Sequence, residues 1–384
     1  MARLPRGVVA LGLVSLCMDM SSEAIHAILP LYLIGTLGAS ALVLGLIEGL
    51  GEATAQVTKL ASGWFSDRMG RRKPLVLLGY GLGGLTKPLF ALALGPGLVL
   101  VARLLDRVGK GIRGAPRDAL LADLVPEAQR GAAFGLRQSM DTVGAILGPA
   151  LALAVMLLGG TPRLVFVLAV VPAMAAVAVL WLAVEEPARP GPAPPRPRLD
   201  WAALREMGRP FWETVAAGAV LTLARVSEAF LILRATDEGL TIALAPLVLI
   251  LFNLVYAGSA WPAGMVSDRI GRRGLIATGF GLLVAADVLL ALDGGPLVVA
   301  IAIAFWGLHM GLTQSLLSAE IARHAPASAR ATAFGLFNLV TGVALLAGNA
   351  AAGGLWLWGG AAATFGAGAL IAAAGLALIL RRAG

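Results

Sequence analysis

Residues 63–72 have the sequence Gly-Trp-Phe-Ser-Asp-Arg-Met-Gly-Arg-Arg, and residues 264–273 repeat it as Gly-Met-Val-Ser-Asp-Arg-Ile-Gly-Arg-Arg, an offset of 201 residues. A second match has nearly the same offset, because Arg130-Gly-Ala-Ala-Phe-Gly-Leu136 recurs 200 residues later as Arg330-Ala-Thr-Ala-Phe-Gly-Leu336. Two separate matches at nearly one offset predict an internal repeat of helical units. Many secondary transporters build a central site from such repeats.

The sequence around both copies is strongly apolar. Of the 384 residues, 58% are hydrophobic and only 14% are charged, whereas about a quarter are charged in a soluble domain. At about 20 apolar residues per spanning helix, the chain holds roughly a dozen helices and no soluble catalytic domain. Apolar runs of this length also exclude a transmembrane β-barrel, whose strands alternate in polarity. The composition therefore predicts an all-α polytopic membrane protein.

Apolar runs bounded by Gly, Pro and charged residues predict twelve transmembrane helices. They lie near 8–33, 41–65, 74–95, 98–123, 131–158, 163–184, 210–233, 241–266, 274–293, 297–320, 331–355 and 360–381. The Pro- and Arg-rich stretch 185–209 is expected to be an extended cytoplasmic linker between two six-helix bundles, 1–184 and 210–384.

The charge distribution predicts the orientation. Nineteen loop Lys and Arg residues fall on one side of the expected membrane, and only Arg163 and Arg234 fall on the other. By the positive-inside rule, both termini face the cytoplasm, which predicts a multi-pass protein of the cytoplasmic (inner) membrane. The net charge of +8 is then an orientation signal, and we expect no nucleic-acid partner.

The loop at residues 63–72 and its copy resemble the signature loop and the two pseudo-repeated halves of the major facilitator superfamily (MFS). The resemblance covers the whole chain. Arg103-Leu-Leu-Asp-Arg-Val-Gly is similar to a pattern in the superfamily's fourth helix, with Asp106 and Arg107 replacing Gln and Gly. Gly144, Gly148 and Pro149 resemble the start of a motif typical of its exporters. Glu185-Glu186-Pro187 resembles its acidic-Pro ending after the sixth span.

Within the loop, Gly63 and Gly70 permit a tight turn between two spanning helices. The arginines are expected to meet carboxylates or lipid phosphates, or to serve only as topology anchors. For Asp67 the resemblance implies a conformational latch between the halves, with Asp268 as a weaker counterpart. The expected latch residues are Gly63, Asp67, Arg68, Gly70, Arg71, Asp268 and Arg269.

Ionisable residues inside the spans indicate function, because a charge in hydrocarbon needs a partner or a water-filled cavity. Most of them lie in the first half. The candidate substrate and proton-coupling residues are Asp19, Glu23, Glu48, Glu52, Lys110, Arg113 and Asp141. The second half offers only Arg225, Glu228, Asp287, His309 and Glu320.

Several of these charges could simply pair. Arg137 with Asp141, and Arg225 with Glu228, have spacings that predict pairing within one helix. Asp19 and Glu23 have no partner on their helix and lie one turn apart, so we expect one of them to hold a proton, as a proton carrier requires.

Two further alternatives remain open at the sequence level. Lys110, Arg113 and Arg117 could line a cavity for an anionic cargo or neutralise Glu48, Glu52 and Asp141. His26 is a weak candidate metal ligand, because it lies about 10 Å along the helix from Asp19 at about 1.5 Å per residue.

The sequence has no nucleophile elbow, His/Cys metal cluster or Walker loop, so we expect neither an enzyme nor a cofactor. The predicted function is secondary active transport by alternating access, with proton-coupled export (antiport, efflux) of a small organic molecule. The proton gradient would supply the energy, and we expect a monomer. The alternatives are an importer or facilitator of an anionic metabolite and a transporter of a divalent metal or metal chelate.

Overall fold

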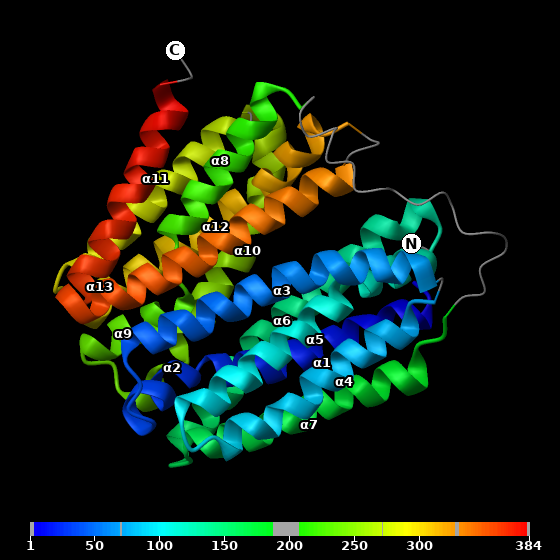
Figure 1. The fold of residues 1–384 in the computed structure, drawn as a ribbon, viewed down its shortest axis with the longest axis horizontal. Helices are drawn as coiled ribbons and strands as arrows, with labels where there is room; N and C mark the ends of the chain where they lie inside the picture. Colours follow the sequence, from blue (N-terminus) through cyan, green and yellow to red (C-terminus); the bar gives the residue numbers. More distant parts are fainter. Residues whose placement is uncertain (1–3, 70, 187–206, 271, 327–329, 382–384) are drawn as a thin grey trace. The chain divides into compact units, whose positions relative to one another are not determined.

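The computed structural model describes residues 4–69, 71–186, 207–270, 272–326 and 330–381. Within these ranges it describes no side chain for residues 64, 67, 68, 268–270, 315, 330, 331 and 381. All regular elements in these ranges are helices, as the composition predicts (Figure 1).

The described residues of the first half form seven α-helices and two short helical turns. They are α1 (Arg6–His26), α2 (Leu29–Leu31), the π-helical turn η1 (Tyr32–Thr36), α3 (Ala41–Met69), α4 (Lys73–Leu92), α5 (Pro96–Asp123), the 3-10 turn η2 (Glu127–Gln129), α6 (Arg130–Leu157) and α7 (Pro162–Ala183).

The second half contains six α-helices and a 3-10 turn in the part that the structure describes. They are α8 (Arg209–Ala224), α9 (Glu228–Asp237), η4 (Ile242–Leu244), α10 (Leu247–Ile270), α11 (Arg272–Ala291), α12 (Gly295–His324) and α13 (Arg330–Arg381). Non-helical backbone at Gly359 and Gly360 divides α13 into two spans, and Gly360 has φ 63°, which favours glycine.

The helices confirm the expected membrane architecture. Among the described residues, nine helical stretches are long and apolar enough to cross a bilayer. The charged helices α3 and α5 are equally long, at 29 and 28 residues. Together with the division of α13, they account for all twelve predicted spans.

The predicted seventh span contains a break between two helices. The span 210–233 breaks after Ala224, and a new helix begins at Glu228 with Ser227 as its N-cap. The amide of Ser227 donates to the side-chain oxygen of Asn349 at 2.7 Å, which satisfies a backbone group that the break leaves without a helical partner. The predicted pairing of Arg225 with Glu228 within one helix is therefore wrong, because the two residues lie on opposite sides of the break.

The chain forms two compact units. Unit 1 comprises residues 1–37 and 54–196, and unit 2 comprises residues 38–53 and 197–384. The first part of α3 therefore groups with the C-terminal helices, and the rest of α3 groups with unit 1.

In unit 1, α1 packs against α6 and α7, while α4 packs against α5 and α7 (Figure 1). Glycine permits the close crossing of α4 and α5, because a Cβ on Gly79 would lie 2.7 Å from the carbonyl oxygen of Gly109. Small residues at helix crossings are the usual way in which membrane helices pack closely.

Candidate functional site

Two glycines of α6 pack against the face of α1 that bears Asp19 and Glu23, which we call the acidic face of α1. A Cβ on Gly144 would lie 2.4 Å from the carbonyl oxygen of Leu16 and 3.1 Å from Cβ of Asp19. A Cβ on Gly148 would lie 2.5 Å from the carbonyl oxygen of Met20 and 3.0 Å from Cβ of Glu23. The two glycines therefore allow α6 to lie directly against the turn of α1 that bears both carboxylates.

The carboxylates of α1 lie in a charged environment. The charged groups around Asp19 are Asp141, Arg113, Lys110 and Glu23. One carboxylate oxygen of Glu23 lies 3.6 Å from Nδ1 of His26, one turn further along α1. The prediction that Glu23 has no partner on its own helix is therefore wrong. The structure thus brings together five of the predicted coupling residues: Asp19, Glu23, Lys110, Arg113 and Asp141.

Two basic residues of α5, Arg113 and Lys110, lie near this acidic face and differ in burial. Arg113 is 4% exposed, and its guanidinium lies 4.6 Å from the centre of the Tyr80 ring on α4. This is a cation–π contact, which stabilises a charge that has left water. Lys110 is exposed, although its charge acts on both Asp19 and Glu23. Lys110 therefore places a positive charge beside the acidic face and within reach of solvent or cargo.

Lys87 of α4 belongs to the same charged region and was missed by the sequence analysis. Its ammonium group donates to Asp106 of α5 at 2.8 Å and to the hydroxyl of Ser22 on α1 at 2.9 Å. The sequence does contain a signal, because Lys87 is an ionisable residue within the apolar span 74–95. Arg107 also approaches Asp106, at 3.9 Å.

A second group of polar contacts connects four helices of unit 1, with α6 joined through Arg137, whose Nε lies 3.9 Å from Asp118 of α5. Arg117 contacts Asp118 at 3.1 Å and the hydroxyl of Ser15 at 3.3 Å, and Ser15 contacts the hydroxyl of Tyr80 at 3.4 Å. On α6, Arg137 pairs with Asp141, which confirms the predicted intrahelical pair. Arg117, Asp118, Arg137 and Asp141 therefore each have a partner within unit 1.

Glu48 and Glu52 fall in unit 2. Glu48 is 1% exposed and has a carboxylate oxygen 3.5 Å from the hydroxyl of Ser227 at the break between α8 and α9. The charges of Glu52 and Glu228 act on Arg225, at the same break. The structure therefore does not place Glu48 and Glu52 in the same unit as the acidic face of α1.

The two halves have equivalent positions with different chemistry. At an offset of 200 residues, Lys87 corresponds to Asp287 and Asp106 corresponds to Trp306. Asp287 and Trp306 are buried neighbours, as are Lys87 and Asp106. The repeat is thus preserved in the packing, while the charge pair is found only in the first half.

The structure describes only some of the remaining motif residues. The side chains of Asp67, Arg68, Asp268 and Arg269 lie outside the described residues, as does the whole of Gly70. Arg71 is exposed. Arg103 is 2% exposed. Gly63 lies inside α3, so the prediction that it serves a tight turn between two helices is wrong. It approaches α5, where its Cβ would lie 3.4 Å from that of Ala115. Pro149 is buried in α6 beside Gly148.

One arginine of each loop motif pairs with a carboxylate near the end of a later helix. Arg72 pairs with Asp123 at the end of α5, at 3.1 Å, and its amide donates to Glu186. In the second half, Arg272 pairs with Glu320 near the end of α12, also at 3.1 Å. The prediction that arginines of these loops meet carboxylates is confirmed for Arg72.

Comparisons with known proteins identify relatives of this chain by sequence. The chain is 32% identical over 366 residues to an uncharacterized MFS-type transporter of Methanocaldococcus jannaschii, covering 92% of this chain and 89% of that protein. It is 31% identical over 124 residues to the multidrug resistance protein MdtH of Photorhabdus laumondii, covering 32% of this chain and 31% of that one.

Solved structures match nearly the whole chain. A variant of the nucleoside transporter NupG superposes with a TM-score of 0.82 at 13% identity, covering 97% of this chain and 99% of that one. A transporter of the POT family in complex with 5-aminolevulinic acid gives a TM-score of 0.82 at 15% identity, covering 98% and 96%. At these identities the likeness shows the fold.

Twelve spanning helices in two repeated halves, with ionisable residues inside the spans, define a secondary transporter. Residues 11–348 and 228–383 match the Major Facilitator Superfamily, and the chain belongs to it. It is a multi-pass membrane transporter and not an enzyme.

Proposed function

We propose that this protein is a proton-coupled exporter of a small organic molecule and works by alternating access. The proposal rests on one observation: Asp19 and Glu23 lie one turn apart on α1, both partly buried, where Gly144 and Gly148 hold α6 against them. Because a carboxylate in a membrane span is costly to keep charged, its protonation can be coupled to a change of conformation.

Antiport follows from competition at these carboxylates. A proton neutralises a carboxylate, whereas a cargo with a positive charge or hydrogen-bond donors binds the charged carboxylate. The two therefore exclude each other at one site, as proton–cargo exchange requires. A coupling of this kind needs the cargo to bind one protonation state better than the other, because a ligand shifts an equilibrium only through differential affinity.

Export is supported by two resemblances. The Gly144, Gly148 and Pro149 pattern is similar to that of the superfamily's exporters, and part of the chain is similar to a multidrug resistance protein. By the same argument, Asp67 and Arg68, with Asp268 and Arg269 in the second copy, would form the latch that changes state when the halves rock.

The orientation is part of the proposal. The excess of Lys and Arg in loops on one side supports cytoplasmic termini and a location in the inner membrane. We propose residues 1–184 and 210–384 as the two moving bundles, with 185–209 as a cytoplasmic linker. A monomer suffices for this mechanism, because both bundles belong to one chain.

The proton coupling can be tested in proteoliposomes that contain a trapped pH-sensitive dye. Compounds from a panel are added outside, and uptake is measured by mass spectrometry alongside the dye signal. We expect the entry of a transported compound to raise the internal pH, because protons leave as cargo enters. Uptake without a pH change, or with acidification, would contradict antiport.

Lys110 supports a second candidate function, the import or facilitated movement of an anionic metabolite. It is exposed, and its charge lies beside Asp19 and Glu23. The substitution Lys110→Gln separates the two functions. It should abolish the transport of an anion, whereas it should leave the transport of a cationic or neutral cargo largely intact.

A further inference from the structure

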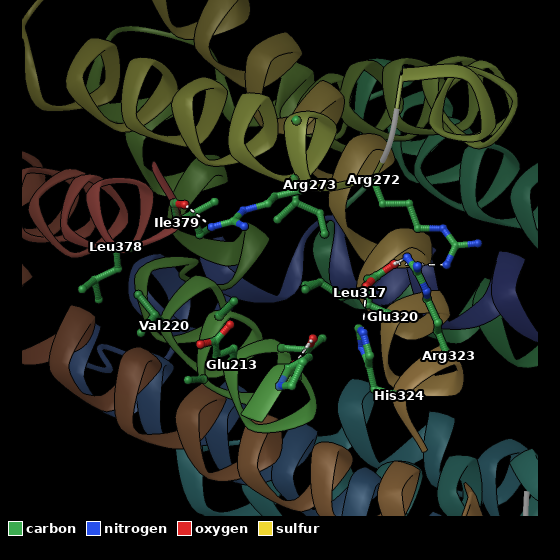
Figure 2. A pocket seen from close by; sticks show the side chains of 17 residues that line it. Glu213, Val220, Arg272, Arg273, Leu317, Glu320, Arg323, His324, Leu378 and Ile379 are labelled. Atoms are coloured by element: carbon green, nitrogen blue, oxygen red, sulfur yellow. Dashed lines mark hydrogen bonds and ion pairs between the residues drawn. The ribbon is translucent and has the colours of Figure 1, made fainter. Parts of the chain in front are cut away.

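A pocket of about 560 Å³ opens in unit 2 where α8 and α11 begin and where α12 and α13 end (Figure 2). Its walls include the apolar side chains of Val220, Ile276, Leu317 and Leu378. The candidate coupling residues of unit 2 do not line it, so the proposed transport mechanism leaves this pocket without a role.

The charged part of the lining has more basic than acidic side chains: Arg272, Arg273, Arg323 and His324 against Glu213 and Glu320. Figure 2 shows Arg272, Arg323 and His324 gathered around Glu320, at 3.1, 3.8 and 3.6 Å. One carboxylate therefore serves two guanidinium groups and an imidazole. A guanidinium has five N–H donors, so both arginines keep donors for another anion.

A third arginine extends this basic rim. Arg273 donates to the carbonyl oxygen of Ile379 on α13 at 2.8 Å, which uses only part of its hydrogen-bonding capacity (Figure 2). The side chain of Arg323 is 69% exposed, so the basic rim is accessible from outside the pocket. The arrangement suits a ligand with an anionic group.

The position of the pocket along the spanning helices suits a lipid. It lies at the ends of four spanning helices, where headgroups meet the hydrocarbon region. Trp212 in the first turn of α8 is 43% exposed, and tryptophan at a helix end is typical of the membrane interface. Leu378 is 52% exposed, so the apolar wall continues outward to the surface that faces lipid tails.

We propose that this pocket binds an anionic phospholipid, with the phosphate at Arg272 and Arg323. An acyl chain lies along Val220, Ile276 and Leu378. A soluble phosphate would account for the basic rim alone, whereas a lipid accounts for both the rim and the apolar wall. Binding joins α8, α11, α12 and α13, and it therefore stabilises unit 2.

Native mass spectrometry of the purified full-length protein tests the proposal. The probes are dioleoyl phosphatidylglycerol, which is anionic, and dioleoyl phosphatidylcholine, which has no net charge. We expect phosphatidylglycerol to bind at least about tenfold more tightly, and Arg272→Gln or Arg323→Gln to remove most of that difference. Arg130→Gln, at an exposed arginine of unit 1, is the control and should change nothing. Equal binding of the two lipids would overturn the proposal.

A second pair of variants tests the apolar wall without changing the charge. Leu378→Trp places a larger side chain at a residue that lines the pocket, whereas Leu380 does not line it and is similarly exposed, at 55%. We expect Leu378→Trp to weaken phosphatidylglycerol binding and Leu380→Trp to preserve it. Equal effects of the two variants would contradict an acyl-chain site.

Inorganic phosphate distinguishes the two sources of the anion. In thermal unfolding, phosphatidylglycerol should stabilise the wild type more than Leu378→Trp, and phosphate in excess should stabilise neither. If phosphate stabilises both proteins equally and displaces phosphatidylglycerol, the site binds a soluble anion and the lipid proposal is wrong. Variants that lose binding must unfold at the wild-type temperature in the absence of lipid, so that misfolding is recognised.

Discussion

The ammonium group of Lys87 lies 2.8 Å from a carboxylate oxygen of Asp106, and the side chains are only 1% and 5% exposed. The pair connects α4 to α5, and the contact of Lys87 with Ser22 extends the connection to α1. Because the positions equivalent to Lys87 and Asp106 in the second half are Asp287 and Trp306, this ion pair is specific to the first half.

This pair gives the first prediction. Asp106→Asn leaves the buried ammonium of Lys87 without its counter-charge, so it should destabilise the fold by about 3–5 kcal/mol. The double variant Lys87→Met with Asp106→Leu should recover part of that loss, because it removes the ammonium of Lys87 together with its counter-charge, whereas Arg107 still loses its contact with Asp106. Thermal unfolding in detergent measures both effects.

The exposed pair Arg209 and Glu213 is the matched control, at 80% and 34% exposure. Its removal should cost at most about 1 kcal/mol, as is usual for exposed ion pairs. If Asp106→Asn costs no more than Glu213→Gln, the buried pair is not a structural connection between α4 and α5.

The second prediction concerns the glycines of α6. Gly144→Ala should lower both stability and transport, because its Cβ would lie 2.4 Å from the carbonyl oxygen of Leu16. Relieving that contact moves α6 away from α1 and displaces Asp19. Gly135→Ala in the same helix is the control, since no heavy atom lies within 4 Å of its added Cβ. Equal tolerance of both substitutions in transport and unfolding assays would exclude tight packing at Gly144.

The third prediction concerns Asp67, in the last turn of α3. If Asp67 is the latch that the family resemblance implies, Asp67→Asn should abolish most transport. The temperature of unfolding should change little, because even a side chain that caps a helix usually contributes only about 1 kcal/mol. Asp268→Asn should have a smaller effect on transport. Small and equal effects of the two variants on transport would mean that both loops are only structural.

The fourth prediction concerns orientation. Reporters fused after Arg6, within residues 190–200 and after Arg382 should all be active on the cytoplasmic side, because the loop arginines and lysines concentrate there. The measurement is a paired assay with alkaline phosphatase and a fluorescent protein at each position. A periplasmic signal within residues 190–200 would rule out the proposed arrangement of six helices on each side of the linker.

The fold could be predicted from the sequence because spanning helices are defined by the length and polarity of single segments. The break at Arg225–Ser227 could not, since it depends on Asn349, which lies 122 residues from Ser227. No glycine or proline marks the break in the sequence.

The candidate site was predictable only in part. Arg137 and Asp141 are one helical turn apart, so their pairing follows from spacing alone. The pairing of Lys87 with Asp106 joins two helices, and the packing of those helices decides it. The grouping of Glu48 with Ser227 rather than with Asp19 also depends on packing, because sequence spacing does not say which unit α3 contacts.

The central claim is that the carboxylates of α1 couple proton movement to transport. The most direct measurement compares gradient-driven accumulation of a transported compound with its gradient-free exchange in proteoliposomes. The variants are Asp19→Asn, Glu23→Gln and the control Asp118→Asn, whose native carboxylate already pairs with Arg117 at 3.1 Å. We predict that at least one α1 variant loses accumulation and keeps exchange, while the control keeps both. If both α1 variants accumulate the compound with the wild-type dependence on pH, the coupling site lies elsewhere and the claim is wrong.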